Sequence, residues 1–262
     1  MSSFTNPTVV IAPGAWPIVD FFHPLIQAFE ERSYPAMCKI GSHLDSQVTE
    51  TEALTNPDTK YLRENVLLPL VEEGKDIVLL MHSYGGIYGA SAVEGLSKRE
   101  RSNNRKRGGV VALIFVAAFT ASKGQSAMDA MGFDPKNPPD WIHHDENTGM
   151  VHITKAREML FHDVPEEEAI RLEKALPRQP YSSFVATLTY DPYSDPWYKD
   201  SCGYLFTEAD RMLPMVAQEM YAKAAGARTV VLKNSSHSAH IERPAELADK
   251  TIALLKQIEQ SG

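Results

Sequence analysis

The sequence predicts an α/β fold in which helices cover both faces of a doubly wound, mostly parallel sheet, with an inserted, mainly helical lid. Continuous apolar segments such as 76–81 and 110–116 are typical of strands that are buried on both faces. Segments with helical periodicity lie between them, so the pattern is a repeated βα unit. This alternation stops near Ser126 and resumes after Pro196, which indicates an insertion.

Strands and helices alternate regularly in the N-terminal half. In chain order we expect a strand at 8–12, an amphipathic helix at 21–32, a strand at 36–40, a helix at 60–73, a strand at 76–81, a small-residue helix from Ile87 and a strand at 110–116. A polar loop rich in Ser, Thr and Asp follows the second strand. Because buried parallel strands need helices on both faces, these units predict the doubly wound sheet.

Residues 98–107 are strongly basic, with six basic side chains and one acidic one. Their polar spacing and the following Gly108-Gly109 favour a solvated loop between a helix and a strand. The alternative is a docking patch for an acidic partner.

The insertion has a different pattern from the rest of the chain. We expect a Pro-rich loop at 135–139, a small hairpin around 146–149, helices at 154–163, 165–176 and 180–189, and a closing segment at Trp197. The βα pattern then resumes with a strand at 203–206, a helix at 214–225, a strand at 229–232 and a helix at 244–260. The predicted division is a core of residues 1–125 and 197–262 and a lid of residues 126–196. Substrate would enter between them, at the carboxyl ends of the strands.

Composition indicates an ordinary globular protein. The 262 residues are 43% hydrophobic and 23% charged, which is enough for a sizeable core. A formal net charge of −8 argues against a nucleic-acid partner. Cys38 and Cys202 are too few for a disulfide framework, and no apolar stretch approaches the roughly 20 residues of a membrane span. We therefore expect a cytoplasmic protein without a membrane partner; a homodimer is compatible with the sequence.

The segment Met81-His82-Ser83-Tyr84-Gly85-Gly86 sets a serine on the turn between a buried strand and a helix. Such a turn holds the serine clear of the backbone, next to a helix N-terminus that favours developing negative charge. The G-x-S-x-G pattern is half met, because Gly85 is present but Met81 replaces the first glycine. A methionine there is expected to push the strand and helix slightly apart. The alternative is a Gly-rich turn with no chemical role.

Two loops beyond later strands carry the groups that a nucleophilic serine needs, a base and a carboxylate that orients it. Asp210 follows the strand at 203–206, and His237 follows the strand at 229–232. Because each lies past the end of a buried strand, both are expected at the same sheet edge as the serine. On the residues alone, Glu208 is an alternative acid. His240 is an alternative base, although a position facing the lid or packed beneath it is favoured.

Four segments together carry a resemblance to a known family: Pro13–Trp16, His82–Gly86, Phe206–Pro214 and Ser236–Pro244. The chain resembles the α/β-hydrolase superfamily, in particular the esterase-like branch that contains plant methylesterases and hydroxynitrile lyases. Segments 119–126 and 160–167 also resemble the lid entrance and lid helices of that branch, so the resemblance spans nearly the whole chain. It implies the α/β-hydrolase fold, in which Ser, Asp and His follow in this chain order.

The resemblance implies a role for each residue of the site. Ser83 would be the nucleophile, His237 the general base and acid, and Asp210, rather than Glu208, the carboxylate that orients His237. The backbone N–H groups of Ala15 and Tyr84 would form the oxyanion hole.

The chain also departs from the family pattern. Pro13 replaces the usual histidine before the oxyanion glycine, which removes one donor and stiffens the turn. The lyase members carry a threonine where this chain has Gly14 and a lysine where it has Ser238. Cyanohydrin cleavage therefore loses support.

We expect neither a metal nor a cofactor. His143, His144 and Asp145 are consecutive, and adjacent histidines in a loop lack the spacing that converges on one ion. Gly-rich phosphate loops and nucleotide fingerprints do not occur in the sequence.

The leading hypothesis is a hydrolase that cleaves an ester or lactone of a mostly apolar small molecule by acylation of Ser83 and hydrolysis by a water that His237 activates. The predicted walls of the substrate pocket are Trp16, Phe119, Met128, Trp141, Phe161 and Tyr181. A second hypothesis uses the same residues in a lyase, C–C bond hydrolase or isomerase that acts on a biosynthetic intermediate. A third is a small-molecule receptor. Since a general base must be unprotonated, the enzyme hypotheses predict a loss of activity in acid.

Overall fold

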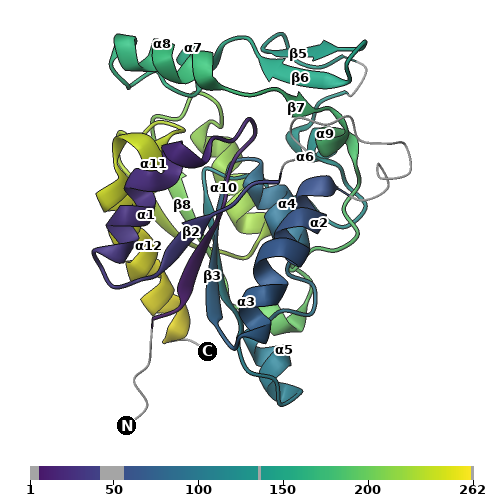
Figure 1. Ribbon diagram of the computed structural model, residues 1–262, viewed down its shortest axis with the longest axis vertical. Coiled ribbons are helices and arrows are strands. Elements are labelled where there is room, and N and C mark those ends of the chain that lie inside the picture. The colour runs from purple at the N-terminus through teal and green to yellow at the C-terminus, as the bar shows by residue number, and fades with distance from the viewer. Residues whose placement is uncertain (1–5, 42–55, 135–136, 261–262) are drawn as a thin grey trace.

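A parallel sheet forms the centre of the molecule (Figure 1). The computed structural model describes residues 6–41, 56–134 and 137–260, and within them the central sheet has six strands in the order β2-β1-β3-β4-β8-β9. Every neighbouring pair is parallel, and the order runs outward in both directions from β1. The strands are β1 (Thr8–Ala12), β2 (Ala36–Cys38), β3 (Asp76–His82), β4 (Gly109–Val116), β8 (Cys202–Thr207) and β9 (Arg228–Leu232). The predicted doubly wound parallel sheet is confirmed.

Helices cover both faces of this sheet (Figure 1). On one face lie α1 (His23–Glu30), which follows the 3-10 turn η1 (Val19–Phe22), and α12 (Pro244–Glu259). On the other face lie α4 (Gly85–Ser91), α10 (Met215–Ala224) and the helical segment at 57–72.

Strand β3 shows why the apolar pattern of the sequence is continuous. Successive side chains of a strand point to opposite faces. Ile77, Leu79 and Met81 pack into the half of the core that contains α4, whereas Val78 and Leu80 pack into the half beneath α1 and α12. All five side chains are fully buried. A strand covered on both faces therefore needs an apolar residue at every position.

The helix expected at 60–73 consists of three pieces, α2 (Pro57–Leu62), the π-helical turn η4 (Arg63–Leu67) and α3 (Leu68–Glu72). The N–H of Leu68 bonds to the carbonyl of Arg63, five residues back. Pro69 follows directly and has no N–H to donate, so the helix widens where a regular turn would meet the proline ring.

The expectation of a solvated loop at 98–107 is correct only for residues 104–107, which are exposed and not helical. Residues Lys98–Asn103 form helix α5, and Arg101 is buried. Its guanidinium donates to the carbonyl of Gly108 at 3.0 Å and to that of Val71 at 3.0 Å, and it contacts the Glu72 carboxylate at 3.1 Å. The charge pattern resembled a solvated loop because sequence spacing does not show which basic side chain turns inward.

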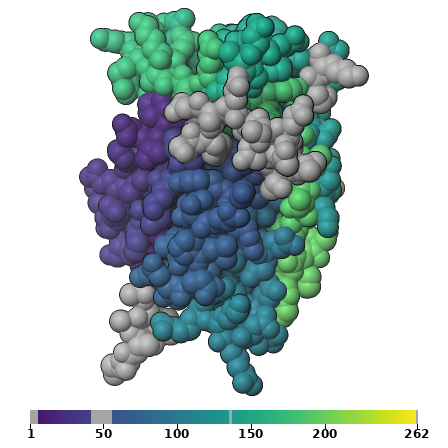
Figure 2. Space-filling model, turned by 45° about the vertical axis from the view of Figure 1, so that its right-hand side comes forward, coloured from purple at the N-terminus to yellow at the C-terminus, as the bar shows by residue number. Residues whose placement is uncertain are grey.

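The elements between β4 and β8 are α6 (Ala127–Met131), β5 (Ile142–Asp145), β6 (Met150–Ile153), α7 (Ala156–Met159), α8 (Glu166–Ala175), β7 (Gln179–Pro180), α9 (Ser182–Val185) and the 3-10 turn η5 (Pro196–Tyr198). Of these, β5, β6, α7 and α8 lie across the carboxyl ends of the central strands, at the top of Figure 1. The turn η5 lies instead near the amino end of β4, where the Ser97 hydroxyl donates to the carbonyl of Trp197 at 2.8 Å. We call residues 126–196 the lid. In Figure 2 the green part of the lid packs directly on the purple N-terminal segment.

The expected hairpin at 146–149 is confirmed, because β5 and β6 pair antiparallel around it. Strand β7 adds a third strand to this small sheet, which the sequence did not predict. The helices expected at 154–163 and 180–189 are much shorter, four residues each in α7 and α9. Most of the polar loop expected after the second strand, and part of the Pro-rich loop at 135–139, lie outside the described residues. In the described ranges, no helix is long and apolar enough to cross a bilayer.

Candidate active site

Ser83 occupies the turn between β3 and α4 with a backbone φ of 53°. This left-handed conformation costs a residue with a side chain about 1–3 kcal/mol, so surrounding contacts must hold it. The N–H of Ser83 donates to the carbonyl of Val116 at 3.2 Å, and the Ser83 carbonyl accepts the N–H of Phe119 at 3.2 Å. The strained serine is thus fixed by the end of β4. Such a turn is typical of a nucleophile elbow.

Two glycines after the serine allow α4 to approach the sheet. A Cβ on Gly85 would collide with the carbonyl oxygen of Ala12, and one on Gly86 would collide with the carbonyl oxygen of Phe119. Any larger residue at either position would push α4 away from the strand ends. Gly85, the glycine of the G-x-S-x-G motif that this chain does have, therefore lies where the helix contacts the backbone of β1 most closely.

The motif has a glycine where this chain has Met81. Another glycine, Gly89 of α4, leaves room for the methionine side chain. A Cβ on Gly89 would lie 3.0 Å from both Cγ and Sδ of Met81. The methionine side chain therefore fills the gap over Gly89, one turn further along the helix. The expected separation of strand and helix is offset by this pairing, which Met81 alone could not reveal.

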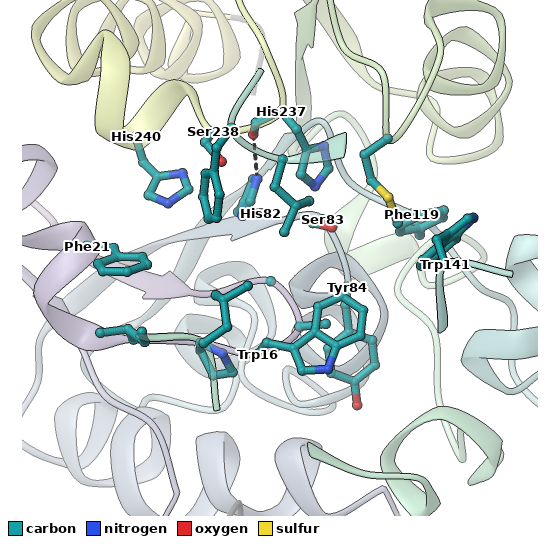
Figure 3. Close-up of a pocket in the computed structure, with 18 of the residues that line it drawn as sticks. Trp16, Phe21, His82, Ser83, Tyr84, Phe119, Trp141, His237, Ser238 and His240 are labelled. Carbon is teal, nitrogen blue, oxygen red and sulfur yellow. Dashed lines mark hydrogen bonds between the residues drawn. The ribbon is translucent and has the colours of Figure 1, made fainter. Parts of the chain in front are cut away.

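His237 and Asp210 form a buried hydrogen-bonded pair. The distance between His237 Nδ1 and Asp210 Oδ2 is 2.8 Å, and both side chains are almost completely buried. A carboxylate accepts hydrogen bonds, so Nδ1 carries the proton and Nε2 of the neutral ring is an acceptor. His237 and Ser83 line the same cavity (Figure 3). In the described part of the chain no hydrogen bond joins Ser83 Oγ to His237; such bonds are often long before substrate is bound.

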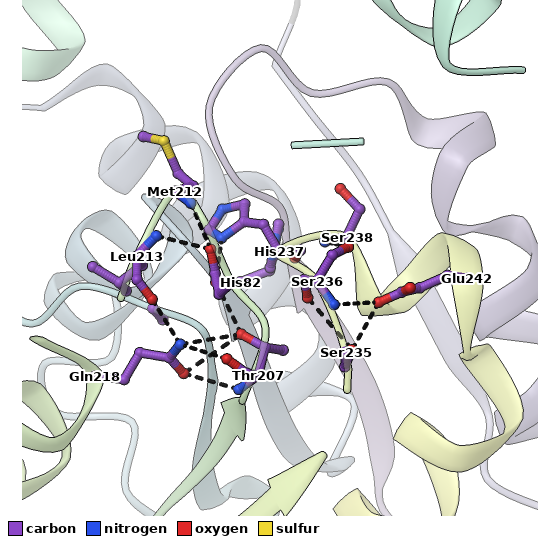
Figure 4. A network of polar contacts seen from close by, with 12 residues as sticks. His82, Thr207, Met212, Leu213, Gln218, Ser235, Ser236, His237, Ser238 and Glu242 are labelled. Atoms are coloured by element: carbon purple, nitrogen blue, oxygen red, sulfur yellow. Dashed lines mark hydrogen bonds and ion pairs between the residues drawn. The ribbon is translucent and has the colours of Figure 1, made fainter. Parts of the chain in front are cut away.

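The loop around Asp210 holds the carboxylate with three further donors (Figure 4). Oδ1 accepts the backbone N–H groups of Met212 and Leu213, each at 2.8 Å, and Oδ2 accepts the Thr207 hydroxyl at 2.9 Å. Burial by itself raises the pKa of Asp210, but the His237 ring and these hydrogen bonds outweigh it, so the pKa lies below its ordinary value. The pair is built to keep Asp210 ionised.

Two side chains that the sequence did not single out, the buried Gln218 and the half-buried Glu242, support these loops. Gln218 of α10 accepts the N–H of Thr207 at 2.9 Å and donates to the carbonyl of Leu213 at 2.7 Å. Glu242 of α11 (Ala239–Glu242) accepts from the hydroxyl of Ser235 at 2.8 Å and from the N–H of Ser236 at 2.7 Å, just before His237. Their partners lie on other elements, and helical periodicity gives no signal for such contacts.

The two alternatives left open by the sequence lie in different surroundings. Glu208 is exposed, and its carboxylate accepts the backbone N–H of Asn234 at 3.0 Å. His240 is buried in the cavity wall, with its ring stacked on Phe22 at a centroid distance of 4.2 Å and an angle of 7°. Burial, together with the nearby histidine rings, lowers its pKa well below the ordinary value. Of the two carboxylates, Asp210 is the one that contacts His237.

The turn after β1 lies against Ser83. A Cβ on Gly14 would lie 3.1 Å from both Ser83 Cβ and His82 Nδ1, so only a glycine lets the turn come this close without displacement. Ala15, next along the turn, and Tyr84, next after the serine, line the same cavity. These are the two residues whose backbone N–H groups were expected to form an oxyanion hole.

The cavity beside Ser83 has mainly apolar walls (Figure 3). Of the predicted wall residues, the structure brings four to it: Trp16, Phe119, Trp141 and Phe161. Met128 and Tyr181 lie elsewhere. Met128 belongs to α6 and is buried in the core, and Tyr181 lines a separate groove on the lid, where its ring stacks on His144. Further wall residues that the sequence did not indicate are Phe21, Phe22, Leu160, Phe184 and Met212.

Metal-binding side chains are not grouped in the described residues, which contain no cluster of three or more His, Cys, Asp or Glu side chains suited to an ion. His143 faces His152 across the β5–β6 pair, with ring centroids 4.8 Å apart. Both cysteines, Cys38 and Cys202, are free and buried, and burial raises the pKa of each thiol to about 12.

Comparison with known proteins gives one family. A family model described as "Alpha/beta hydrolase family" matches residues 9–250. A curated relative, "Alpha/beta hydrolase nvfD" from Aspergillus novofumigatus, is 25% identical over 245 residues, which cover 91% of this chain and 92% of that protein.

Solved structures with the same fold cover nearly the whole chain. Polyneuridine aldehyde esterase matches with a TM-score of 0.72 at 15% identity, covering 95% of this chain and 98% of the other. The methylesterase MES16 from Arabidopsis matches with a TM-score of 0.68 at 19% identity, covering 95% and 99%. A pyrethroid hydrolase from Sphingobium faniae matches with a TM-score of 0.67 at 18% identity, covering 96% and 98%.

Proposed function

The chain belongs to the alpha/beta hydrolase family, and from this membership we propose that it is a serine hydrolase that cleaves an ester or lactone of a mostly apolar small molecule. The residues proposed to carry the reaction are Ser83, His237 and Asp210. The reaction uses no cofactor, because these side chains and two backbone N–H groups supply every step.

The observation that carries this proposal is the buried Asp210–His237 pair, 2.8 Å between Oδ2 and Nδ1, beside a serine in the left-handed conformation of an elbow. Both features have an unfavourable effect on the free energy of folding. A buried carboxylate has to be held by several donors, and the serine conformation costs about 1–3 kcal/mol. Both are accounted for if the groups act together as base, orienting acid and nucleophile.

The proposed reaction begins when Ser83 Oγ attacks the carbonyl carbon while its proton moves to His237 Nε2. Asp210 keeps the Nδ1–H oriented and stabilises the resulting imidazolium. The N–H groups of Ala15 and Tyr84 donate to the oxyanion of the tetrahedral intermediate. Collapse breaks the ester C–O bond, and the leaving alcohol takes the proton from His237. A water activated by His237 then releases the acid and restores Ser83.

The cavity supports the apolar substrate class. Aromatic side chains from the N-terminal turn and from the lid, such as Trp16, Trp141 and Phe161, face it. Apolar walls of this kind bind a substrate through burial of its apolar surface, while a few polar groups fix the reacting bond. Two of the structural neighbours are named as esterases, and a third as a hydrolase of pyrethroids, which agrees with the proposal of an ester substrate.

A fluorophosphonate probe tests the nucleophile directly, read by intact mass and by hydrolysis of p-nitrophenyl butyrate. We expect one adduct on the wild-type protein, located at Ser83, and none on Ser83→Ala. Ser83→Ala and His237→Ala should both lose ester hydrolysis. An unlabelled wild-type protein would overturn the acyl-enzyme mechanism. A Ser83→Ala variant that keeps most turnover while His237→Ala loses it would instead indicate base catalysis without acylation.

A further inference from the structure

The lid contributes a buried hydrogen-bond acceptor to the turn that carries the proposed oxyanion donor. Gln179 lies in β7 and is 1% exposed. Its side-chain Oε1 accepts the backbone N–H of Trp16 at 2.8 Å, a contact between residues 163 positions apart. The proposed mechanism does not use Gln179, and no pattern in the sequence singled it out.

Trp16 needs such a partner because its backbone is strained, with a φ of 53°. A left-handed residue with a side chain is strained and persists only where its surroundings hold it. A second lid contact acts on the same residue, since the indole Nε1–H donates to the carbonyl of Val151 in β6 at 3.2 Å. The Trp16 ring also packs on Phe184 of α9, at a centroid distance of 6.0 Å. Residues of the lid therefore contact both the backbone N–H and the indole ring of Trp16.

These contacts bear on the peptide unit next to them. Ala15 lies between two fixed points. On one side Gly14 packs against Ser83 and His82 at distances that leave no room for a Cβ without displacement. On the other side the peptide unit between Ala15 and Trp16 is fixed by the Gln179 acceptor. With both neighbouring peptide units held, the direction of the Ala15 N–H is held as well.

We propose that Gln179 is a positioning residue for the oxyanion hole: its side-chain carbonyl holds the left-handed turn at Trp16 and so aims the Ala15 N–H at the reacting carbonyl. This inference rests on the proposed function. Without the acceptor, the Trp16 N–H would be buried and unpaired, and the contact that offsets the strain of the left-handed turn would be lost. The turn then relaxes, and the Ala15 donor moves off its target.

The test compares variants that differ in the acceptor alone. Gln179→Met keeps the length of the side chain and removes the acceptor, whereas Gln179→Glu keeps an acceptor oxygen. Arg178→Ala is the matched lid control, because Arg178 is exposed and its side chain pairs with Asp145 at 3.6 Å. Three quantities are measured: the second-order rate of fluorophosphonate labelling, kcat and KM for p-nitrophenyl butyrate, and hydrogen exchange of a peptide covering residues 13–18.

For Gln179→Met we expect labelling and kcat to fall about 10- to 100-fold, somewhat less than complete loss of an oxyanion donor, with KM nearly unchanged. Exchange in residues 13–18 should become faster. Gln179→Glu should recover most of the loss, and Arg178→Ala should behave as wild type. If Gln179→Met does not fold, Gln179→Asn, which withdraws the amide by one methylene, replaces it.

Each contrary result has a distinct meaning. If the wild-type protein is labelled at Ser83 and Gln179→Met is labelled equally fast, the positioning role is overturned while the proposed function stands. A Gln179→Glu variant as slow as Gln179→Met also overturns it, since shape rather than the acceptor would then matter. If the wild-type protein itself is not labelled, the serine-hydrolase proposal fails first.

Discussion

Replacing Asp210 by asparagine tests how His237 is oriented. The asparagine amide must present its NH₂ group either at the position of Oδ1 or at that of Oδ2. Oδ1 accepts two backbone N–H groups, from Met212 and Leu213, which cannot reverse. Oδ2 faces His237 Nδ1 and the Thr207 hydroxyl. The ring can move its proton to the other nitrogen, and the hydroxyl can rotate.

The expected loss of kcat follows from the difference between the donors at Oδ1, which are fixed, and those at Oδ2, which can reverse. An NH₂ facing the two backbone donors would leave two buried donors unpaired, at about 1–3 kcal/mol each. The amide therefore turns its NH₂ toward His237, which then accepts at Nδ1 and carries its proton on Nε2. A base protonated on that nitrogen cannot take the proton of Ser83. We expect kcat to fall about 10⁴-fold, equivalent to about 5 kcal/mol, with the fold intact.

The assay is kcat for p-nitrophenyl butyrate, combined with the rate of fluorophosphonate labelling and a urea unfolding curve. Glu208→Gln is the matched control, because Glu208 is the other acidic residue of the same loop and its replacement still has an oxygen to accept the N–H of Asn234. As an exposed substitution it should change kcat by no more than about twofold.

Two results would refute this reasoning. An Asp210→Asn variant within tenfold of wild type would mean that the carboxylate does not set the His237 tautomer. A Glu208→Gln variant that loses as much activity as Asp210→Asn would assign the orienting role to Glu208 instead.

Three further predictions concern stability, each measured by urea unfolding. Met81→Ala should destabilise the fold by about 2–5 kcal/mol. Gly89→Ala should destabilise the Met81→Ala variant less than it destabilises the wild type, because the added Cβ and the methionine side chain occupy the same space. Additive losses of stability in the double variant would contradict this pairing. Burial lowers the pKa of His82 from 6.5 to about 3, so between these values the unfolded chain binds the extra proton and stability falls as the pH is lowered. His82→Gln should reduce that slope by up to about 1.4 kcal/mol per pH unit, and an unchanged slope would show that His82 does not titrate this way. Arg101→Met should destabilise by about 2–4 kcal/mol while Arg99→Met changes little, and equal effects would contradict the burial of Arg101.

The central sheet could be predicted because its cause is local. A strand such as 76–82 that is buried on both faces has to be apolar along its length, and this pattern is visible without knowing its neighbours. The turn that follows is equally local, since Gly85 and Gly86 mark the place where a helix meets the backbone of other strands. Because parallel strands end at one edge, the loops bearing Asp210 and His237 could be expected near Ser83.

Very short elements and the burial of a charged side chain could not be predicted in the same way. The two-residue strand β7 has no period to detect, and it forms only because β6 offers it an edge. Arg101 lies in a run of charges whose composition is that of a solvated surface. Its burial depends on the carbonyls that surround it, which come from segments about 30 positions earlier and from the end of its own loop.

Local pattern was thus enough for the layered sheet, for Ser83 and for the two loops that carry the acid and the base, because each follows the end of a strand that the pattern itself marks. It left Glu208 and His240 open beside Asp210 and His237, and the resemblance to the family decided between the two carboxylates. The walls of the cavity and its supports needed the tertiary structure. Aromatic residues look alike in a sequence whether they face a cavity or the core, and Gln179 meets Trp16 only through folding of the lid onto the sheet. Contacts between distant segments depend on the packing of whole elements, and no spacing along the chain encodes them.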